Sequence, residues 1–159
     1  MGKCLIIYYS QSGTTAKVAE YITKGLQSVG YNVDLYNIMH AKPRNICQYD
    51  LIGIGSPVYF FNPVREIRKY ISQCKELSGK PVFIFVAYGT NKGKSIDILQ
   101  RLVTSKGAKY VGSISCQNAN FIIGCPSRKE GYLSLDHISK EELKQAEEFG
   151  ARLGMELIR

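Results

Sequence analysis

The sequence predicts an α/β fold in which a five-stranded parallel sheet lies between two layers of helices. Apolar runs of strand length alternate along the chain with segments whose apolar residues recur at helical spacing. Residues 4–9, 50–56 and 81–87 are almost entirely apolar, which is typical of strands buried on both faces. Residues 31–36 and 110–116 alternate in polarity and are expected at the sheet edges. These patterns favour the strand order 2-1-3-4-5.

The predicted helices are recognised by apolar stripes and by their end signals. Asn62 is predicted to cap the second helix, with Pro63 at its first helical position. Ser139 and Glu142 form a capping box for the last helix. Residues 38–48 are predicted to be loop or short helix, and residues 117–137 have no clear period. The residues expected to face the core are Val18, Ala19, Ile22, Leu26 and Val29; Val64, Ile67 and Ile71; Ile96, Leu99, Leu102 and Val103; and Leu143, Ala146, Phe149 or Gly150, Leu153 and Leu157.

The length and composition are those of one folded domain, residues 1–159. Of the 159 residues 45% are hydrophobic, which excludes general disorder. No apolar run reaches the roughly 18 residues that a membrane span needs, and the N-terminus does not resemble a signal peptide. We therefore expect a cytoplasmic protein without a membrane partner.

The formal net charge of +8 raises nucleic acid as a partner. However, the cations are spread along the chain, and no basic run or recognition motif is present, so no nucleic-acid partner is predicted. A solvated surface is the simpler interpretation, and an acidic protein partner is the second.

None of the five cysteines forms a C-x-x-C pair, so no metal site is predicted. Cys4 and Cys116 fall in predicted strands and are expected to be core thiols. Cys125, in a loop beside Pro126, is the thiol to test for reactivity.

The first connection carries the clearest chemical signal. Residues 10–15 bring four hydroxyl side chains and Gly13 to the start of a helix, where about four N–H groups lack partners and the dipole is positive. Such a site suits a phosphate, although an ordinary capped helix has the same pattern. The loop has no lysine, so it is not a Walker A loop, and it lacks the three glycines of the dinucleotide fingerprint.

Two further loops should open at the same edge of the sheet. The helices after strands one and three are expected on opposite faces, so the ligand site is expected in the crevice between the C-terminal ends of these strands. Residues 55–61 offer flat apolar and aromatic surface, and residues 87–93 offer Tyr88 and exposed backbone. A flat aromatic ligand needs apolar contact on its faces and backbone hydrogen bonds at its edge, and these loops can give both. Both loops can also be explained as structural anchors.

Ser10-Gln11-Ser12-Gly13-Thr14-Thr15 resembles the phosphate loop of the flavodoxin family, and Gly55-Ser56-Pro57-Val58-Tyr59 resembles that family's flavin loop after strand three. The resemblance covers nearly the whole chain and implies a flavodoxin-like three-layer sandwich that binds FMN. The chain differs from the usual family pattern in its net positive charge and in its lack of tryptophan. The cofactor residues implied are Ser10, Gln11, Ser12, Gly13, Thr14 and Thr15; Ser56, Pro57, Val58, Tyr59 and Phe60; and Ala87, Tyr88, Gly89 and Thr90.

By this resemblance the chain is expected to carry electrons between redox partner proteins, among them acidic, ferredoxin-like ones. An FMN-dependent NAD(P)H:quinone-type reductase is the alternative, and a non-catalytic module that has lost FMN is a third. No residue is assigned a catalytic role, and His40 and His137 are weak candidates. Residues 117–137 would either line a substrate pocket or form a loop that docks a partner. The residues of this segment considered for either role are Phe121, Arg128, Lys129 and Tyr132.

Overall fold

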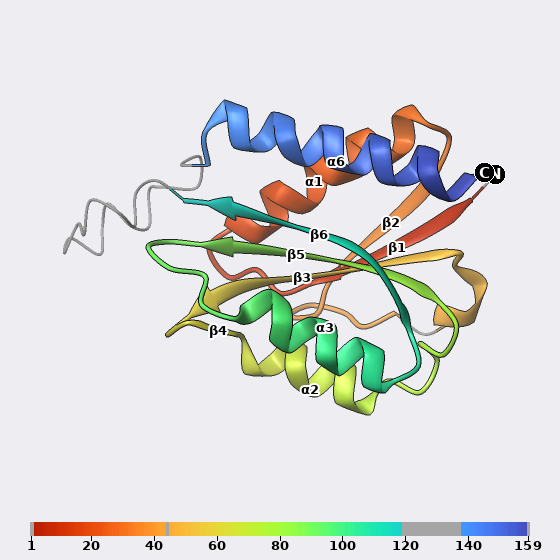
Figure 1. Ribbon diagram of the computed structural model, residues 1–159, viewed down its shortest axis with the longest axis horizontal. Coiled ribbons are helices and arrows are strands. Elements are labelled where there is room, and N and C mark those ends of the chain that lie inside the picture. The colour runs from red at the N-terminus through yellow and green to blue at the C-terminus, as the bar shows by residue number, and fades with distance from the viewer. Residues whose placement is uncertain (1, 44, 119–137, 159) are drawn as a thin grey trace.

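The structure, a computed structural model, describes residues 2–43, 45–118 and 138–158 (Figure 1). Its parallel strands are β1 (Lys3–Tyr8), β2 (Asn32–Asn37), β3 (Leu51–Tyr59), β5 (Pro81–Tyr88) and β6 (Lys109–Gln117), and the two-residue β4 (Asn62–Pro63) pairs antiparallel with β3. Its helices are α1 (Thr14–Ser28), the 3-10 turn η1 (Ile46–Gln48), α2 (Arg65–Gln73), α3 (Ser95–Ser105) and α6 (Lys140–Ile158).

The sheet has the order β2-β1-β3-β5-β6, which confirms the predicted 2-1-3-4-5 arrangement. Helices α1 and α6 cover one face, and α2 and α3 cover the other (Figure 1). The three continuously apolar strands occupy the centre, whereas β2 and β6 form the edges and are only partly buried. The polarity of each strand therefore predicted its place in the sheet, because only the central strands have helices over their whole width.

Two hydrophobic clusters fill the space on either side of the sheet. On the α1/α6 side, the rings of Phe83 and Phe85 lie over Gly53 and Gly55, their register partners on β3. A Cβ at either glycine would overlap the opposing ring. The two glycines of β3 are thus required by close packing across the strands.

Helices α1 and α6 approach each other through glycines. A Cβ on Gly25 would overlap the carbonyl oxygen of Glu147, and a Cβ on Gly150 would overlap that of Ile22. Backbone thus meets backbone at this contact, and the helices have no room for even a methyl group.

Replacing Gly150 with alanine is therefore expected to lower the free energy of unfolding by about 1–3 kcal/mol, the usual cost of overpacking. Helix propensity alone predicts the opposite sign, a gain of about 1 kcal/mol. Urea denaturation of Gly150→Ala measures the change, and Gln145→Gly, at an exposed position of α6, calibrates the propensity contribution. A more stable Gly150→Ala protein would contradict the close approach.

The start of α2 differs from the prediction. Asn62 does not cap the helix and Pro63 is not its first residue; both lie in β4, and the helix begins at Arg65 after Val64. The predicted loop 56–61 is also shorter, because β3 continues through Tyr59. The chain reverses at residues 60 and 61 and pairs with itself, and this hairpin draws Asn62 and Pro63 away from the helix.

The last helix begins as predicted. The backbone N–H of Glu142 donates to Ser139 Oγ at 3.1 Å. Leu143, Ala146 and Leu153 are buried as expected, and so are both Phe149 and Gly150. In the described part of the link between β2 and β3, η1 is the only regular element, as expected for a loop with a short helical turn.

Candidate functional site

The three predicted loops lie at one edge of the sheet, where the parallel strands end. Tyr8 at the end of β1 is in register with Gly55, and Pro57 is in register with Ala87 near the end of β5. Residues 10–15 follow β1 and residues 89–93 follow β5, while residues 56–59 form the end of β3 and residues 60–61 its turn, all at the same edge. The helices that follow β1 and β3, α1 and α2, lie on opposite faces of the sheet (Figure 1). In sheets of this order, ligands bind between the ends of two such strands.

Ser10 organises the first loop from inside. Its side chain is 7% exposed, and its Oγ accepts hydrogen bonds from the N–H groups of Gly13 at 3.1 Å and Ala16 at 3.3 Å. Gly13 precedes α1 with a φ of 96°, a left-handed conformation that favours glycine. The side chain of Ser10 thus ties the loop to the first turn of α1.

The backbone N–H groups of Gln11, Ser12, Thr14 and Thr15 meet no acceptor among the described residues. All four lie at or just before the first turn of a 15-residue helix, where the dipole favours an anion. The hydroxyls of Ser12 and Thr14 are 3.3 Å apart and belong to the same turn. This donor set fits a phosphate group.

Two asparagines that the sequence prediction missed support this loop. Asn37, at the end of β2, accepts from Ser10 N–H at 3.3 Å through its Oδ1 and donates to the Ser10 carbonyl at 2.9 Å. Asn118, just after β6, is 4% exposed and donates to Thr14 Oγ1 at 3.4 Å. Neither belongs to a recognisable motif, and both come from distant parts of the chain, so only the fold could reveal them.

The second loop is buried at its beginning and exposed at its tip. Ser56 is fully buried, and its Oγ accepts from Val64 N–H at 2.9 Å while donating to the Pro57 carbonyl at 2.7 Å. Pro57 is buried and Val58 half-buried, whereas Tyr59 is 41% exposed and Phe60 is 92% exposed. Ser56 thus anchors the hairpin, and the aromatic residues remain available for contact.

Phe60 and Phe61 form the two-residue turn of this hairpin, and both have positive φ, 51° and 67°. Only type I′ turns combine positive φ at both central positions, and they strongly prefer Asn-Gly. The single hydroxyl proton of Ser95 is shared between the Lys92 carbonyl at 2.7 Å and the Phe61 carbonyl at 3.3 Å. Gly93 lies against the same Phe61 carbonyl, and a Cβ at position 93 would be only 2.5 Å from its oxygen. We call residues 59–61 the aromatic turn.

The third loop is tied to the end of β6. The N–H of Asn118 donates to the Tyr88 carbonyl at 2.7 Å, and Gln117 Nε2 donates to the Gly89 carbonyl at 2.9 Å. Ala87 is buried, Tyr88 and Gly89 are half-buried, and Thr90 is exposed. Burial, and then the charge of Glu142, raises the pKa of Tyr88, so its hydroxyl stays protonated at neutral pH.

All fifteen predicted cofactor residues therefore lie in three segments at one sheet edge. Phe121, Arg128, Lys129, Tyr132 and His137 lie outside the described residues, and so does Cys125. His40 is exposed in the connection after β2.

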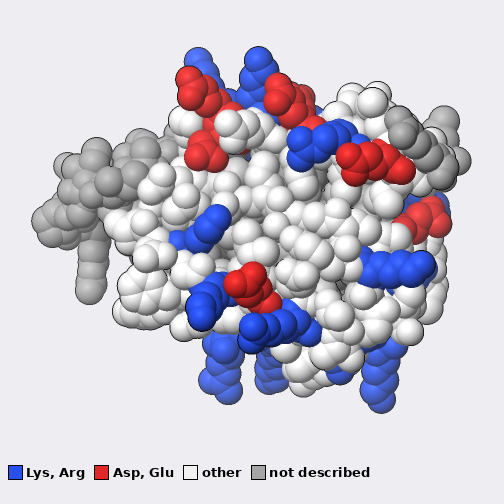
Figure 2. Space-filling model, in the orientation of Figure 1, with Lys and Arg blue, Asp and Glu red and all other residues white. Residues whose placement is uncertain are grey.

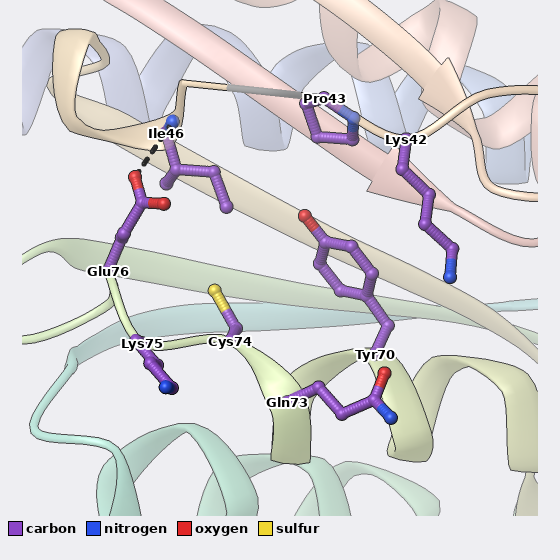
Figure 3. A pocket seen from close by; sticks show the side chains of 8 residues that line it. All are labelled: Lys42, Pro43, Ile46, Tyr70, Gln73, Cys74, Lys75 and Glu76. Carbon is purple, nitrogen blue, oxygen red and sulfur yellow. Dashed lines mark hydrogen bonds between the residues drawn. The ribbon is translucent and has the colours of Figure 1, made fainter.

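A pocket of about 260 Å³ lies elsewhere, between the β2–β3 connection and the end of α2 (Figure 3). Its volume is below the 300–1,000 Å³ typical of small-molecule sites, and it contains none of the predicted cofactor residues. Figure 3 shows Tyr70 rising from α2 toward the segment that carries Pro43. Its lining residues are Lys42, Pro43, Ile46, Tyr70, Gln73, Cys74, Lys75 and Glu76.

Beside this pocket, the exposed thiol of Cys47 donates to Glu76 Oε2 at 3.3 Å. This hydrogen bond is the main reason that the pKa of Cys47 is raised, while Lys80 lowers it. Cys4, Cys74 and Cys116 are buried, and burial raises the pKa of Cys116 to about 12. Of these four thiols, only Cys47 is open to reagents.

Cys47 is therefore expected to react with iodoacetamide faster than these three buried cysteines. Glu76→Gln should speed its reaction a few-fold at pH 8, because loss of the carboxylate lowers the thiol pKa and more thiolate is present. Peptide mass spectrometry across a pH series measures the rate of each cysteine. Glu148→Gln, on exposed α6 surface, is the matched control, and equal rates in both variants would contradict the effect of Glu76.

Among the described residues, no group of three His, Cys, Asp or Glu side chains is placed to hold a metal ion. None of the described helices combines the length and the apolarity needed to cross a membrane.

The fold and the loop cluster define an α/β protein with a candidate ligand site at the ends of β1, β3 and β5. The sequence profile described as flavodoxin domain matches residues 5–103. The chain belongs to the flavodoxin family, and it has the family's parallel-sheet fold.

Several known proteins are similar along most of the chain. An uncharacterised protein of Methanocaldococcus jannaschii is 33% identical over 92% of this chain and 95% of its own length. A flavodoxin of Clostridium saccharobutylicum is 27% identical over 95% and 94%. An NAD(P)H dehydrogenase (quinone) of Acidovorax ebreus is 23% identical over 87% and 78%. The solved structure of an archaeal flavodoxin superposes with a TM-score of 0.76 at 16% identity, covering 99% of each chain.

Proposed function

We propose that this chain binds FMN and carries electrons between redox proteins as a single cytoplasmic domain. The observation that carries the proposal is a set of four backbone N–H groups at the start of α1 that meet no acceptor among the described residues. Two further loops lie at the same sheet edge. Family membership supports a flavin at this position.

The residues present fit FMN group by group. The N–H groups of Gln11, Ser12, Thr14 and Thr15 would hold the phosphate, with the Ser12 and Thr14 hydroxyls beside them. Tyr59 and Phe60 are exposed aromatic side chains suited to one face of the ring, and the segment from Tyr88 to Thr90 is suited to the other. When bound, FMN supplies the redox chemistry, and the protein supplies binding, orientation and electrostatics.

The charge of the site supports tight binding of the phosphate. Residues 10–15, 56–61 and 87–93 contain no Asp or Glu. A phosphate monoester therefore meets N–H dipoles and no opposing carboxylate within the loops themselves. Ser10 and Asn37 keep those dipoles in position through their mutual hydrogen bonds.

An FMN-dependent NAD(P)H:quinone reductase is the second candidate. It is favoured by the similarity to the Acidovorax ebreus quinone dehydrogenase, but this chain covers only 78% of that protein. It covers 94% of the Clostridium saccharobutylicum flavodoxin. The exposed aromatic turn also favours the electron carrier, because a protein partner can reach it.

Anaerobic reduction of the FMN-loaded protein, followed by visible spectra, separates these functions. A carrier is expected to take up two electrons in two resolved waves, and to show little turnover with NAD(P)H and a quinone. Uptake in one wave with rapid quinone turnover would assign the protein to the reductases. If FMN does not bind in an equilibrium fluorescence titration, the chain is a flavodoxin-like module without the cofactor.

A further inference from the structure

Charge is distributed unequally between the two helical layers. The layer of α1 and α6 carries five cations and six acids, whereas α2, α3 and the loop before α3 carry six exposed cations and two acids, Glu66 and Asp97. Figure 2 shows blue side chains gathered along the lower side, over α2 and α3, and mixed colours over α6. We call the six cations the basic face: Arg65, Arg68, Lys69, Lys92, Lys94 and Arg101.

The two acids of this layer neutralise little of its outward charge. Glu66 and Asp97 lie in the first turns of α2 and α3, where the helix dipole favours a negative charge. Glu66 also faces the hydroxyl of Tyr9, whose pKa is raised by burial and then by this carboxylate. The basic face therefore presents a net positive field to solvent.

The basic face is continuous with the aromatic turn. Ser95 at the start of α3 bonds to the Phe61 carbonyl, and Gly93 packs against the same residue. Lys92 and Lys94 are thus immediate chain neighbours of the contacts that hold the turn. On the other side, β4 leads from the turn through Val64 to Arg65. Phe60 and Phe61, 92% and 58% exposed, are consequently flanked by cations from two elements.

An exposed apolar centre with a charged rim is the usual composition of a protein-binding surface. We propose that the aromatic turn and the basic face form the docking surface for an acidic redox protein, whose carboxylates pair with the six cations while its apolar contact covers Phe60 and Phe61. The proposal rests on the proposed function, because a partner seated here lies directly beside the loops that would hold FMN. Nucleic acid also fits the charge, but its binding does not require a position beside a redox site.

Binding of an acidic plant-type ferredoxin to the full chain, with and without FMN, tests the docking surface by calorimetry at low ionic strength. In Arg68→Glu/Lys94→Glu the Kd is expected to rise at least about tenfold, since like charges now face each other across the interface. Neither side chain belongs to the predicted cofactor site, and both are exposed. The wild-type affinity should also fall as salt is added.

The matched control is Lys140→Glu/Lys144→Glu on α6, which changes the net charge by the same amount at two exposed positions. Its Kd should stay within about twofold of the wild type. Equal losses in both double variants would show a net-charge effect and overturn the proposal, as would no loss in either. Tighter binding of a 20-base-pair DNA duplex, or of phosphatidylglycerol vesicles, than of ferredoxin would also overturn it.

Failure of the proposed electron-carrier function can be distinguished from failure of the docking surface. If the chain binds no FMN but the flavin-free protein still binds ferredoxin through the basic face, the surface stands and the carrier function falls. If FMN binds but ferredoxin does not, the carrier function stands and this docking surface falls.

Discussion

Replacing Ser12 with glutamate is expected to weaken FMN binding at least 100-fold. Ser12 is exposed and lies within the set of N–H groups proposed to hold the phosphate. Two like charges about 4 Å apart repel by about 4 kcal/mol at an effective dielectric constant of 20, and a change of 1.4 kcal/mol corresponds to tenfold in Kd. Fluorescence titration of FMN against the flavin-free protein measures the loss.

The fold of this variant should be intact, because a carboxylate near the start of a helix is favourable toward the dipole. Urea denaturation without FMN should therefore give a free energy of unfolding close to that of the wild type. Ser105→Glu is the matched control: Ser105 is exposed at the far end of α3, and the same charge change there should leave the Kd nearly unchanged. Equal affinity in both variants would place the phosphate elsewhere.

Replacing Phe60-Phe61 with Asn-Gly is expected to stabilise the flavin-free protein by about 2 kcal/mol. Both phenylalanines have positive φ, which costs an ordinary residue about 1–2 kcal/mol, while Asn-Gly is the preferred pair for a type I′ turn. For a chain of this size the midpoint of thermal unfolding should rise by about 4–8 °C. Thermal and urea denaturation measure the effect.

The matched control for this prediction is Phe60→Ala/Phe61→Ala, which removes the same rings but keeps residues that disfavour positive φ. It should not reproduce the stabilisation, and equal stability of the two variants would contradict the conformational explanation. Both variants should bind FMN more weakly, because each removes the aromatic surface proposed for the ring. The strained turn thus lowers the free energy of unfolding but provides a contact surface, as is common at functional sites.

The strand order and the identity of the three loops were predictable because they depend on local pattern. Each central strand is apolar on both faces, and each edge strand alternates, so polarity separates the central strands from the edge strands. Ser139 could be recognised as a cap because its partner Glu142 is three residues away. Signals of this kind are carried within one turn or one strand, and they do not depend on distant residues.

The start of α2 could not be predicted from local signals. Asn62 and Pro63 form a good helix start in isolation, but pairing with Val58 and Tyr59 draws them into β4. The hairpin is held by Ser56, which bonds to Val64 eight residues later, and by Ser95, which bonds to Phe61 from α3. Tertiary hydrogen bonds thus outweighed a local capping preference worth about 1 kcal/mol.

By itself, then, the sequence determined the family, the sheet order and the segments proposed to form the site. Only the tertiary structure decided that Asn37 and Asn118 support the phosphate loop and that two phenylalanines occupy a left-handed turn. It alone also decided that the cations gather over α2 and α3. These features join residues far apart in the chain, and their positions follow from how the strands and helices pack, which no local pattern records.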